Sequence, residues 1–454
     1  MRRHICVFLI SKHTALVSRP ERNEPVRPPL RLKDTYVFFA PLVLMVELNM
    51  ISKSAIHAFL ARTETPSVTL AAFNAAFTLY YAITSATELI AVLCLSYLKS
   101  RADIFRLLGF IALVLLIPVL LVVTVALTSA GDAVFGDWFG LGLKAQAEAR
   151  QACIILLLSM PVLLLRGVAF AVLMLNRRTL VITWSTLIRL LSLGISLVFL
   201  PHWLDGAAIG AGALVFCMFA ETVFAWCMVW PNVKALPPRR ESRDTVSGYW
   251  RFSWPLMINQ SAEMGVVFTI NVLLGRLEQA ELAIAAFGVA HGLVSLLMGP
   301  MRNLLQTAQT LVARREDVRV MLIFTGQLVG IFTVLALVLF QTSLRETILN
   351  DVMGLTPELA AYCAPAVEIA FLMAAFWSGA ALFRGLLAKA RTTTSLAFSG
   401  SMRILTAGLI AALSLVYADF NGALLGVIAW IGSYVVEALF SAWRLRRLGW
   451  YVEA

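Results

Sequence analysis

The sequence predicts an all-α protein that crosses a membrane many times. Three observations support this prediction: the hydrophobic composition, the number of long apolar runs, and a duplication of the chain. Hydrophobic residues make up 60% of the 454 positions and charged residues 14%, whereas soluble domains are about half apolar and a quarter charged. The composition therefore excludes an ordinary soluble globular protein.

Twelve apolar runs are long enough to cross a bilayer, because a spanning helix needs about 20 largely apolar residues. Six of them lie near residues 36–58, 67–98, 105–129, 152–175, 179–200 and 206–230. After the polar stretch "PNVKALPPRRESRDTVSG", six more lie near residues 250–274, 281–312, 319–343, 360–389, 393–416 and 422–443. We expect one helix in each run.

The polar stretches divide the chain into five expected parts. These are a Pro/Arg-rich cytosolic tail (1–35), an N-lobe (36–230), a cytoplasmic linker (231–249), a C-lobe (250–445) and a cytoplasmic C-terminus (446–454). We call the two large parts the N-lobe and the C-lobe throughout.

The distribution of basic residues predicts the orientation. The net charge of +11 comes from short clusters that all fall on one side of the twelve-helix arrangement, and most acidic loop residues fall on the other side. Because basic loops stay in the cytoplasm, we expect both termini to be cytoplasmic, in a multi-pass protein of the plasma (inner) membrane. Topology explains the positive charge, and no nucleic-acid partner is expected.

The two halves read as copies of one unit. The stretches "FFAPLVLMVELNM" at 38–50 and "FSWPLMINQSAEM" at 252–264 align at a spacing of 214 residues (255 − 41). Pairs at this spacing, or at 216 (422 − 206), include Pro41/Pro255, Arg101/Arg315, Asp103/Asp317, Arg189/Arg403, Gly206/Gly422, Gly210/Gly426 and Glu221/Glu437. An even number of helices per copy predicts two six-helix lobes related by a pseudo-two-fold axis along the membrane normal, with a binding cleft near mid-membrane.

Charged residues recur inside the expected helices. Nine lie about ten residues deep, roughly 15 Å from the cytoplasmic end, and one, Arg384, is slightly shallower. The nine are Glu47, Glu88, Arg166, Arg189, Glu221, Glu263, Arg302, Arg403 and Glu437. A charge facing lipid at this depth costs about 2.5–3.5 kcal/mol, so we expect these side chains to face protein or water.

Two of the charged pairs are duplicated. Arg189 with Glu221, and Arg403 with Glu437, sit on consecutive helices at matching depth. The simplest interpretation is a structural ion pair inside each lobe, because a buried arginine needs neutralisation.

The remaining charges suggest a transport site. Arg166, Arg302 and Arg384 are candidates to bind a substrate anion, since the guanidinium fork suits carboxylate and phosphate; alternatively, each pairs with a leftover glutamate. Glu47, Glu263 and Glu88 are candidates to bind a coupling ion, H⁺ or Na⁺.

One further pair carries opposite charges at equivalent positions (302 − 88 = 214). Glu88 and Arg302 either form a gate across the axis or pair within their own lobes.

Several motifs are absent from the sequence. It has no G-x-x-x-x-G-K-[ST], no H-E-x-x-H and no G-x-S-x-G, so neither ATP-driven pumping nor hydrolytic catalysis is indicated. The six cysteines show no CxxC spacing, which argues against a zinc site. We therefore expect no cofactor, no metal and no enzymatic activity.

Short motifs in the second half resemble a known family. They are "WPL" at 254–256, "NVLLGR" at 271–276, "GLLAKARTTTSLAFSGSMRI" at 385–404 and "GALLGVIAWIGSYVVE" at 422–437. The two-times-six design resembles the multidrug/oligosaccharidyl-lipid/polysaccharide (MOP) flippase superfamily, which includes MATE-type exporters, and the motifs are most similar to the progressive ankylosis (ANKH-like) family.

The resemblance implies a role in exporting polyanions such as pyrophosphate, nucleotides or citrate. The positions that it implies are Asn271, Arg276, Arg302, Arg403 and Glu437. The sequence departs from the family where Glu263 and hydrophobic residues replace basic residues after "WPL". A cationic or lipid-linked substrate therefore remains open.

The function that we expect is secondary transport by alternating access, with an anionic or amphipathic small molecule as substrate. A lipid-linked saccharide flippase and a cation-coupled multidrug exporter are the alternatives within transport. A non-transporting membrane scaffold or an intramembrane transferase are the alternatives from other classes.

Overall fold

The computed structural model describes residues 29–449, except for 61, 64–65, 85–88, 139–140, 239–244, 275, 354, 356 and 416–419. Every regular element in these residues is helical. Nine helical stretches among them are long and apolar enough to cross a membrane. The predicted all-α membrane fold is confirmed.

The elements follow the expected runs. The N-lobe contains α1 (Leu32–Leu60), α2 (Pro66–Thr84), α3 (Leu89–Tyr97), α4 (Arg101–Leu127), the π-helix η2 (Asp132–Trp138), α5 (Leu143–Leu157), α6 (Ser159–Leu175), α7 (Thr179–Phe199), η3 (Leu200–His202) and α8 (Ala207–Ala235). The C-lobe contains α9 (Val246–Leu274), α10 (Ala280–Met298), η4 (Gly299–Asn303), α11 (Leu304–Leu311), α12 (Arg315–Gln341), α13 (Leu344–Glu346), the π-helix η5 (Thr347–Val352), α14 (Pro357–Glu368), η6 (Ile369–Leu372), α15 (Met373–Lys389), α16 (Thr394–Ala411), η7 (Ala412–Leu415) and α17 (Gly422–Arg447). Each expected run holds one helix or a series of helical pieces, which is consistent with twelve crossings.

Helical structure extends beyond the predicted runs. α1 begins at Leu32, α8 continues to Ala235 and α9 begins at Val246. These end turns are polar, so hydropathy alone does not detect them. Some runs are also broken. Between α10 and α11 the chain forms a 3₁₀ segment around Pro300, because proline cannot donate the backbone hydrogen bond that an α-helix needs.

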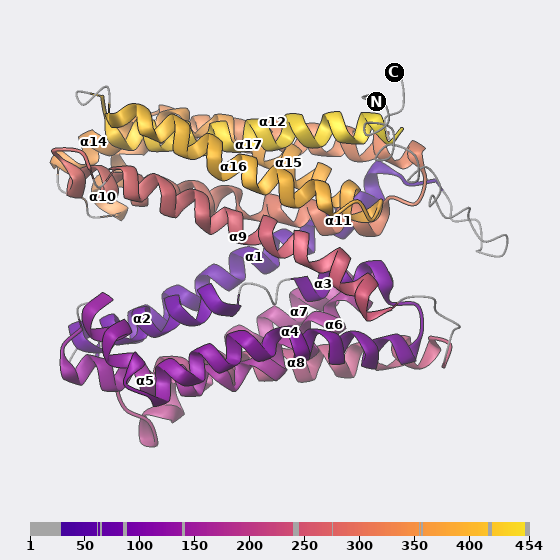
Figure 1. Ribbon diagram of the computed structural model, residues 1–454, viewed down its shortest axis with the longest axis horizontal. Coiled ribbons are helices and arrows are strands. Elements are labelled where there is room, and N and C mark those ends of the chain that lie inside the picture. Colours follow the sequence, from indigo (N-terminus) through magenta and orange to yellow (C-terminus); the bar gives the residue numbers. More distant parts are fainter. Residues whose placement is uncertain are drawn as a thin grey trace, which may run out of the picture.

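The two lobes lie as two layers, with α10 to α17 in one and α2 to α8 in the other (Figure 1). Local details repeat between them. Asp103 accepts a hydrogen bond from the backbone N of Ser100 at 2.8 Å, and Asp317 accepts one from the backbone N of Arg314 at 2.8 Å. The π-helices η2 and η5 also occupy corresponding places, directly after α4 and shortly after α12. The duplication read from the sequence is thus present in the folded chain.

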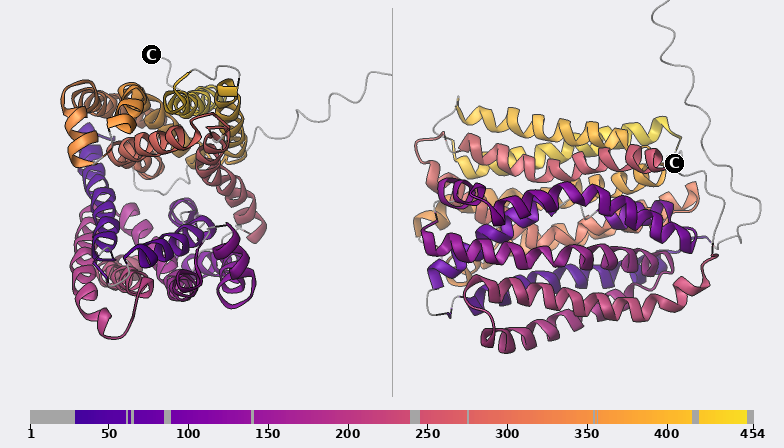
Figure 2. Two further views of the ribbon diagram at one scale, coloured as in Figure 1. Left: turned by 90° about the vertical axis from the view of Figure 1, so that its left-hand side faces the viewer. Right: turned by 60° about the horizontal axis from the view of Figure 1, so that its bottom comes forward.

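The first helix of each lobe leans against the opposite lobe, as the end-on view shows (Figure 2). Near the start of α1, the ring of Phe39 packs edge-on against Phe324 of α12, with centroids 5.3 Å apart. Near the start of α9, Tyr249 packs in the same way against Tyr97 of α3, at 5.0 Å. This reciprocal crossing is the arrangement that a two-fold axis between the lobes produces.

Several side-chain hydrogen bonds between the lobes lie at one end of the molecule. Gln309 of α11 donates from Nε2 to the carbonyl oxygen of Val92 at 2.9 Å and to Ser96 Oγ at 2.7 Å. Arg391 donates to the carbonyl oxygen of Ser96 at 2.9 Å. This is the end where α1 begins and α17 ends (Figure 1), and we call it the termini end.

Candidate functional site

A cavity of about 420 Å³ lies between the lobes. Both lobes line it: α1, α2, α3, α6, α7 and α8 from one, and α9, η4, α11, α15 and α16 from the other. A volume of this size suits a small-molecule ligand. Its charged lining residues are Arg166, Arg189, Arg302, Arg384 and Glu263.

The N-lobe wall is built around one buried carboxylate. Glu221 of α8 is fully buried, and its Oε2 lies 3.0 Å from Arg166 Nε and 3.7 Å from Arg189 Nη1. The hydroxyl of Thr186 donates to the other carboxylate oxygen at 3.2 Å. Arg189 also donates from Nη1 to Asn49 Oδ1 at 2.7 Å. Two arginines therefore share one carboxylate.

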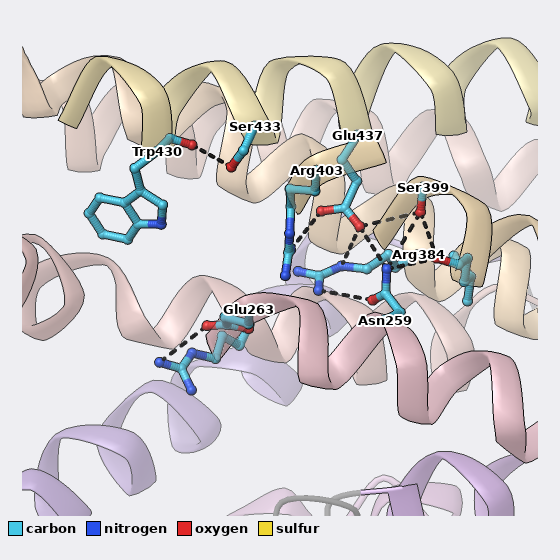
Figure 3. Close-up of polar contacts among 10 residues, drawn as sticks. Asn259, Glu263, Arg384, Ser399, Arg403, Trp430, Ser433 and Glu437 are labelled. Carbon is cyan, nitrogen blue, oxygen red and sulfur yellow. Dashed lines mark hydrogen bonds and ion pairs between the residues drawn. The ribbon is translucent and has the colours of Figure 1, made fainter. Parts of the chain in front are cut away.

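The C-lobe repeats this arrangement (Figure 3). Glu437 of α17 accepts a hydrogen bond from Arg403 Nη1 at 2.9 Å, and its Oε1 lies 4.0 Å from Arg384 Nε. Asn259 of α9 donates to the same Oε1 at 3.0 Å and accepts from Arg384 Nη1 at 3.5 Å. The amide of Asn259 thus connects the carboxylate to an arginine that lines the cavity.

The two clusters differ in how they meet the cavity. Arg189 is 6% exposed and lines it, whereas Arg403 is 0% exposed and does not. In both lobes the sequence placed an arginine and a glutamate on consecutive helices, and the structure brings each pair within ion-pair distance. It also adds a second arginine to each carboxylate, Arg166 in one lobe and Arg384 in the other.

Glu263 and Arg302 form a further pair on the C-lobe side. The side chain of Glu263 on α9 lies 3.7 Å from Arg302 Nη2 on η4, and the guanidinium carbon of Arg302 lies 5.7 Å from the ring centroid of Trp377. Both charged residues line the cavity. Because the 3₁₀ segment around Pro300 replaces a helical turn here, Arg302 sits at a break in the helix.

Other predicted positions lie elsewhere. Glu47 on α1 is partly buried, is not a lining residue, and has no hydrogen bond or ion pair with another described residue. Asn271 lies near the far end of α9, and Arg276 is exposed just beyond it; neither lines the cavity. Glu88 lies outside the described residues. The structure therefore does not bring Glu47, Asn271 or Arg276 to the cavity wall with the arginines.

Two amides were missed by the reading of the sequence. Asn49 and Asn259 both line the cavity and both hold an arginine. A signal existed in the duplication, because Asn49 stands at the position equivalent to Glu263 (263 − 49 = 214). The candidates in the sequence were selected by their charge, and this criterion does not detect neutral amides.

Comparisons with solved structures identify the fold. A MOP superfamily transporter from Pyrococcus furiosus, described as having a binding pocket of reverse polarity that suggests a different function, is 14% identical with a TM-score of 0.73, over 92% of this chain and 96% of that one. A multidrug resistance MATE family transporter in an outward-facing conformation is 14% identical with a TM-score of 0.71, over 93% and 97%. The Vibrio cholerae MATE transporter VcmN in its bent form is 15% identical with a TM-score of 0.71, over 93% and 98%. No family model and no curated protein matches the sequence. The chain therefore has the MATE-like fold of these MOP superfamily transporters.

Proposed function

We propose that this chain is a secondary transporter that works by alternating access and exports a small organic or phosphate-containing anion. The observation that supports this most directly is the charge of the cavity wall, where four arginines and one glutamate are the charged lining residues among those the structure describes. Arginine binds carboxylate and phosphate through its planar fork. A wall of this composition favours an anion over a cation.

The proposal includes a coupling ion. Glu263 is the acidic side chain among the described lining residues, and it contacts Arg302. Binding of a proton or sodium ion at Glu263 would weaken that ion pair and change the charge that the substrate meets. Because Arg302 would contact both Glu263 and the substrate, binding of the ion would change the affinity for the substrate. Glu47 and Glu88 remain secondary candidates.

Orientation is also part of the proposal. If both termini are cytoplasmic, as the basic clusters predict, the termini end faces the cytoplasm. The contacts of Gln309 and Arg391 with α3 then close the cytoplasmic side. We assign the protein to the plasma membrane on the same basis.

A cation-coupled multidrug exporter is the second candidate, because the multidrug resistance transporter described above has the same fold. The Pyrococcus furiosus transporter of the same fold is described as having a pocket of reverse polarity that suggests a different function, so the fold alone does not require multidrug export. The motif resemblance to the progressive ankylosis family points to a polyanion such as pyrophosphate or citrate.

Flux into liposomes tests the proposal. The purified chain is reconstituted and offered pyrophosphate, citrate, ATP or a cationic dye, with and without a pH gradient. We expect anion flux that falls at least about tenfold in Arg302→Gln, since a hydrogen bond to a charged group contributes about 1.5–3 kcal/mol. In Glu263→Gln, we expect flux that no longer responds to the pH gradient.

Arg150→Gln is the matched control. Arg150 Nη2 lies 2.5 Å from Asp132 Oδ1, and neither residue lines the cavity. Its anion flux should equal that of the unaltered chain. Transport of the dye but of no anion would instead assign the chain to multidrug export. Absence of flux for every compound would favour a scaffold, and appearance of a new chemical product would favour a transferase.

A further inference from the structure

Position 49 and its repeat equivalent, position 263, carry different chemistry on opposite walls of the cavity. Both side chains line it, one from α1 and the other from α9. The N-lobe has a neutral amide at this position and the C-lobe has a carboxylate. Because the two repeats differ at this lining position, the two walls of the cavity can bind different chemical groups.

The amide holds an arginine without neutralising it. Asn49 Oδ1 accepts from Arg189 Nη1 at 2.7 Å, whereas the nearest oxygen of Glu221 to Arg189 is 3.7 Å away. A neutral acceptor fixes the orientation of a guanidinium but leaves its positive charge in place. The Nε of Arg189 is buried and has no hydrogen-bond partner among the described residues.

The carboxylate at the equivalent position has the opposite effect. Glu263 lies 3.7 Å from Arg302 and carries the charge that opposes it. In addition, Arg403, the C-lobe equivalent of Arg189, is fully buried against Glu437 and does not reach the cavity. At the repeat position of Arg189 the C-lobe therefore presents no arginine to the cavity. Its own amide-held arginine, Arg384, lies 3.5 Å from Asn259, whereas Arg189 lies 2.7 Å from Asn49.

We propose that Asn49 and Arg189 form an anion subsite on the N-lobe wall, which takes a carboxylate or phosphate oxygen of the substrate. Asn49 is the positioning residue, and it sets the preference for anions because it orients Arg189 while leaving its charge available. This inference rests on the proposed function and adds to it the wall and the residue that select the substrate. It also gives Arg189 a role beyond the structural ion pair predicted from the sequence.

The decisive variant is Asn49→Asp, which keeps the shape of the side chain and adds one negative charge 2.7 Å from Arg189. We expect KM for citrate and for pyrophosphate to rise about 10- to 100-fold, because a hydrogen bond to a charged group is lost. The kcat should change much less, since the substitution leaves the contacts of Gln309 and Arg391 with α3 in place. Asn49→Gln, which keeps a neutral acceptor, should restore most of the affinity.

Gln306→Glu is the matched control, because Gln306 lines the same cavity on α11 and the variant adds the same charge. Its KM should rise several-fold less than that of Asn49→Asp. An equal rise in both variants would overturn the inference, since it would show that the total charge of the cavity matters and position 49 does not. An unchanged KM in Asn49→Asp would overturn it as well.

Two measurements separate this inference from the proposed function. Protection of the unaltered chain from thermal unfolding by pyrophosphate or citrate reports anion binding without transport. If the chain neither binds nor moves these anions, both proposals fail. If it moves them and Asn49→Asp behaves normally, the inference alone fails. If Asn49→Asp does not accumulate, Asn49→Leu takes its place, because it removes the acceptor for Arg189 without adding charge. Its KM must rise by a larger factor than its kcat changes.

Discussion

At the scale of single residues, the main feature is a carboxylate that two arginines share. Glu437 is 0% exposed, and it contacts Arg403 and Arg384, which are 0% and 4% exposed. Glu221 serves two arginines in the same way, but the side chain of Arg166 is 17% exposed. Removing a carboxylate from such a cluster leaves two like charges buried together.

We expect Glu437→Gln to destabilise the protein by about 3–5 kcal/mol, the range for breaking a buried ion pair. Glu221→Gln should have a smaller effect, because Arg166 can reach the cavity and its water. The thermal unfolding midpoint in one detergent compares the two variants. Addition of Arg403→Met should partly rescue Glu437→Gln by removing one of the two stranded charges. Equal midpoints for Glu437→Gln and Glu221→Gln would contradict this account.

At the scale of helices, close approach depends on a glycine in α15. A Cβ atom at Gly385 would lie 2.9 Å from the Cβ of Ala308 and would also press on the backbone of Leu305, both on α11. Real Cβ atoms do not come so near to backbone atoms, so α11 would have to move. α11 also carries Gln309, which contacts the other lobe. Helix packing and the contact between lobes are therefore linked at this place.

Gly385→Ala should destabilise the protein by about 1–3 kcal/mol, as overpacking of a well-filled core does. Gly326→Ala is the matched control on α12, where an added Cβ meets nothing within 4 Å. Its unfolding midpoint should stay the same or rise slightly, because alanine is the better helix former. A fall in both variants would show that α12 tolerates no added volume either, and would remove the argument from close approach.

Much of this helical arrangement could be predicted from the sequence. Hydropathy located every run, and the spacing between Pro41 and Pro255 revealed the duplication. The run at 281–312 was expected to hold one helix, and the 3₁₀ segment around Pro300 divides it, because proline interrupts a helix. The reciprocal lean of α1 and α9 was not predictable, since it depends on contacts such as Phe39 with Phe324, which lie far apart in sequence.

The candidate site was predictable only in part. Depth counting selected Arg166, Arg302 and Glu263, which do line the cavity. It could not separate them from Glu47, because depth along a helix does not say which face a side chain occupies. Asn49 and Asn259 could not be predicted in this way, because a neutral amide inside an apolar helix carries no charge that must be compensated.

At the scale of the whole molecule, the lobes are held together at the termini end. Gln309 and Arg391 from the C-lobe donate hydrogen bonds to α3. The guanidinium of Arg391 also lies 4.3 Å from the ring centroid of Tyr97. In alternating access these contacts must break each time the cavity opens toward that end. The aromatic contacts of Phe39 with Phe324 and of Tyr249 with Tyr97 also join the lobes, so opening must separate apolar contacts as well as polar ones.

A reversible crosslink tests this closure. Ser96 Oγ and Gln309 Nε2 lie 2.7 Å apart, but a direct disulfide needs Cβ atoms about 3.8 Å apart, and glutamine is longer than cysteine. The double variant Ser96→Cys and Gln309→Cys, in a background without the six native cysteines, is therefore bridged with a short bis-methanethiosulfonate reagent, which attaches through reducible disulfide bonds. We expect the bridge to abolish flux, because the lobes can no longer separate, and reduction to restore it. The single variant Ser96→Cys, treated with the same reagent, should keep its flux. Normal flux in the fully crosslinked protein would show that the termini end stays closed throughout transport, and alternating access by separation of the lobes there would have to be abandoned.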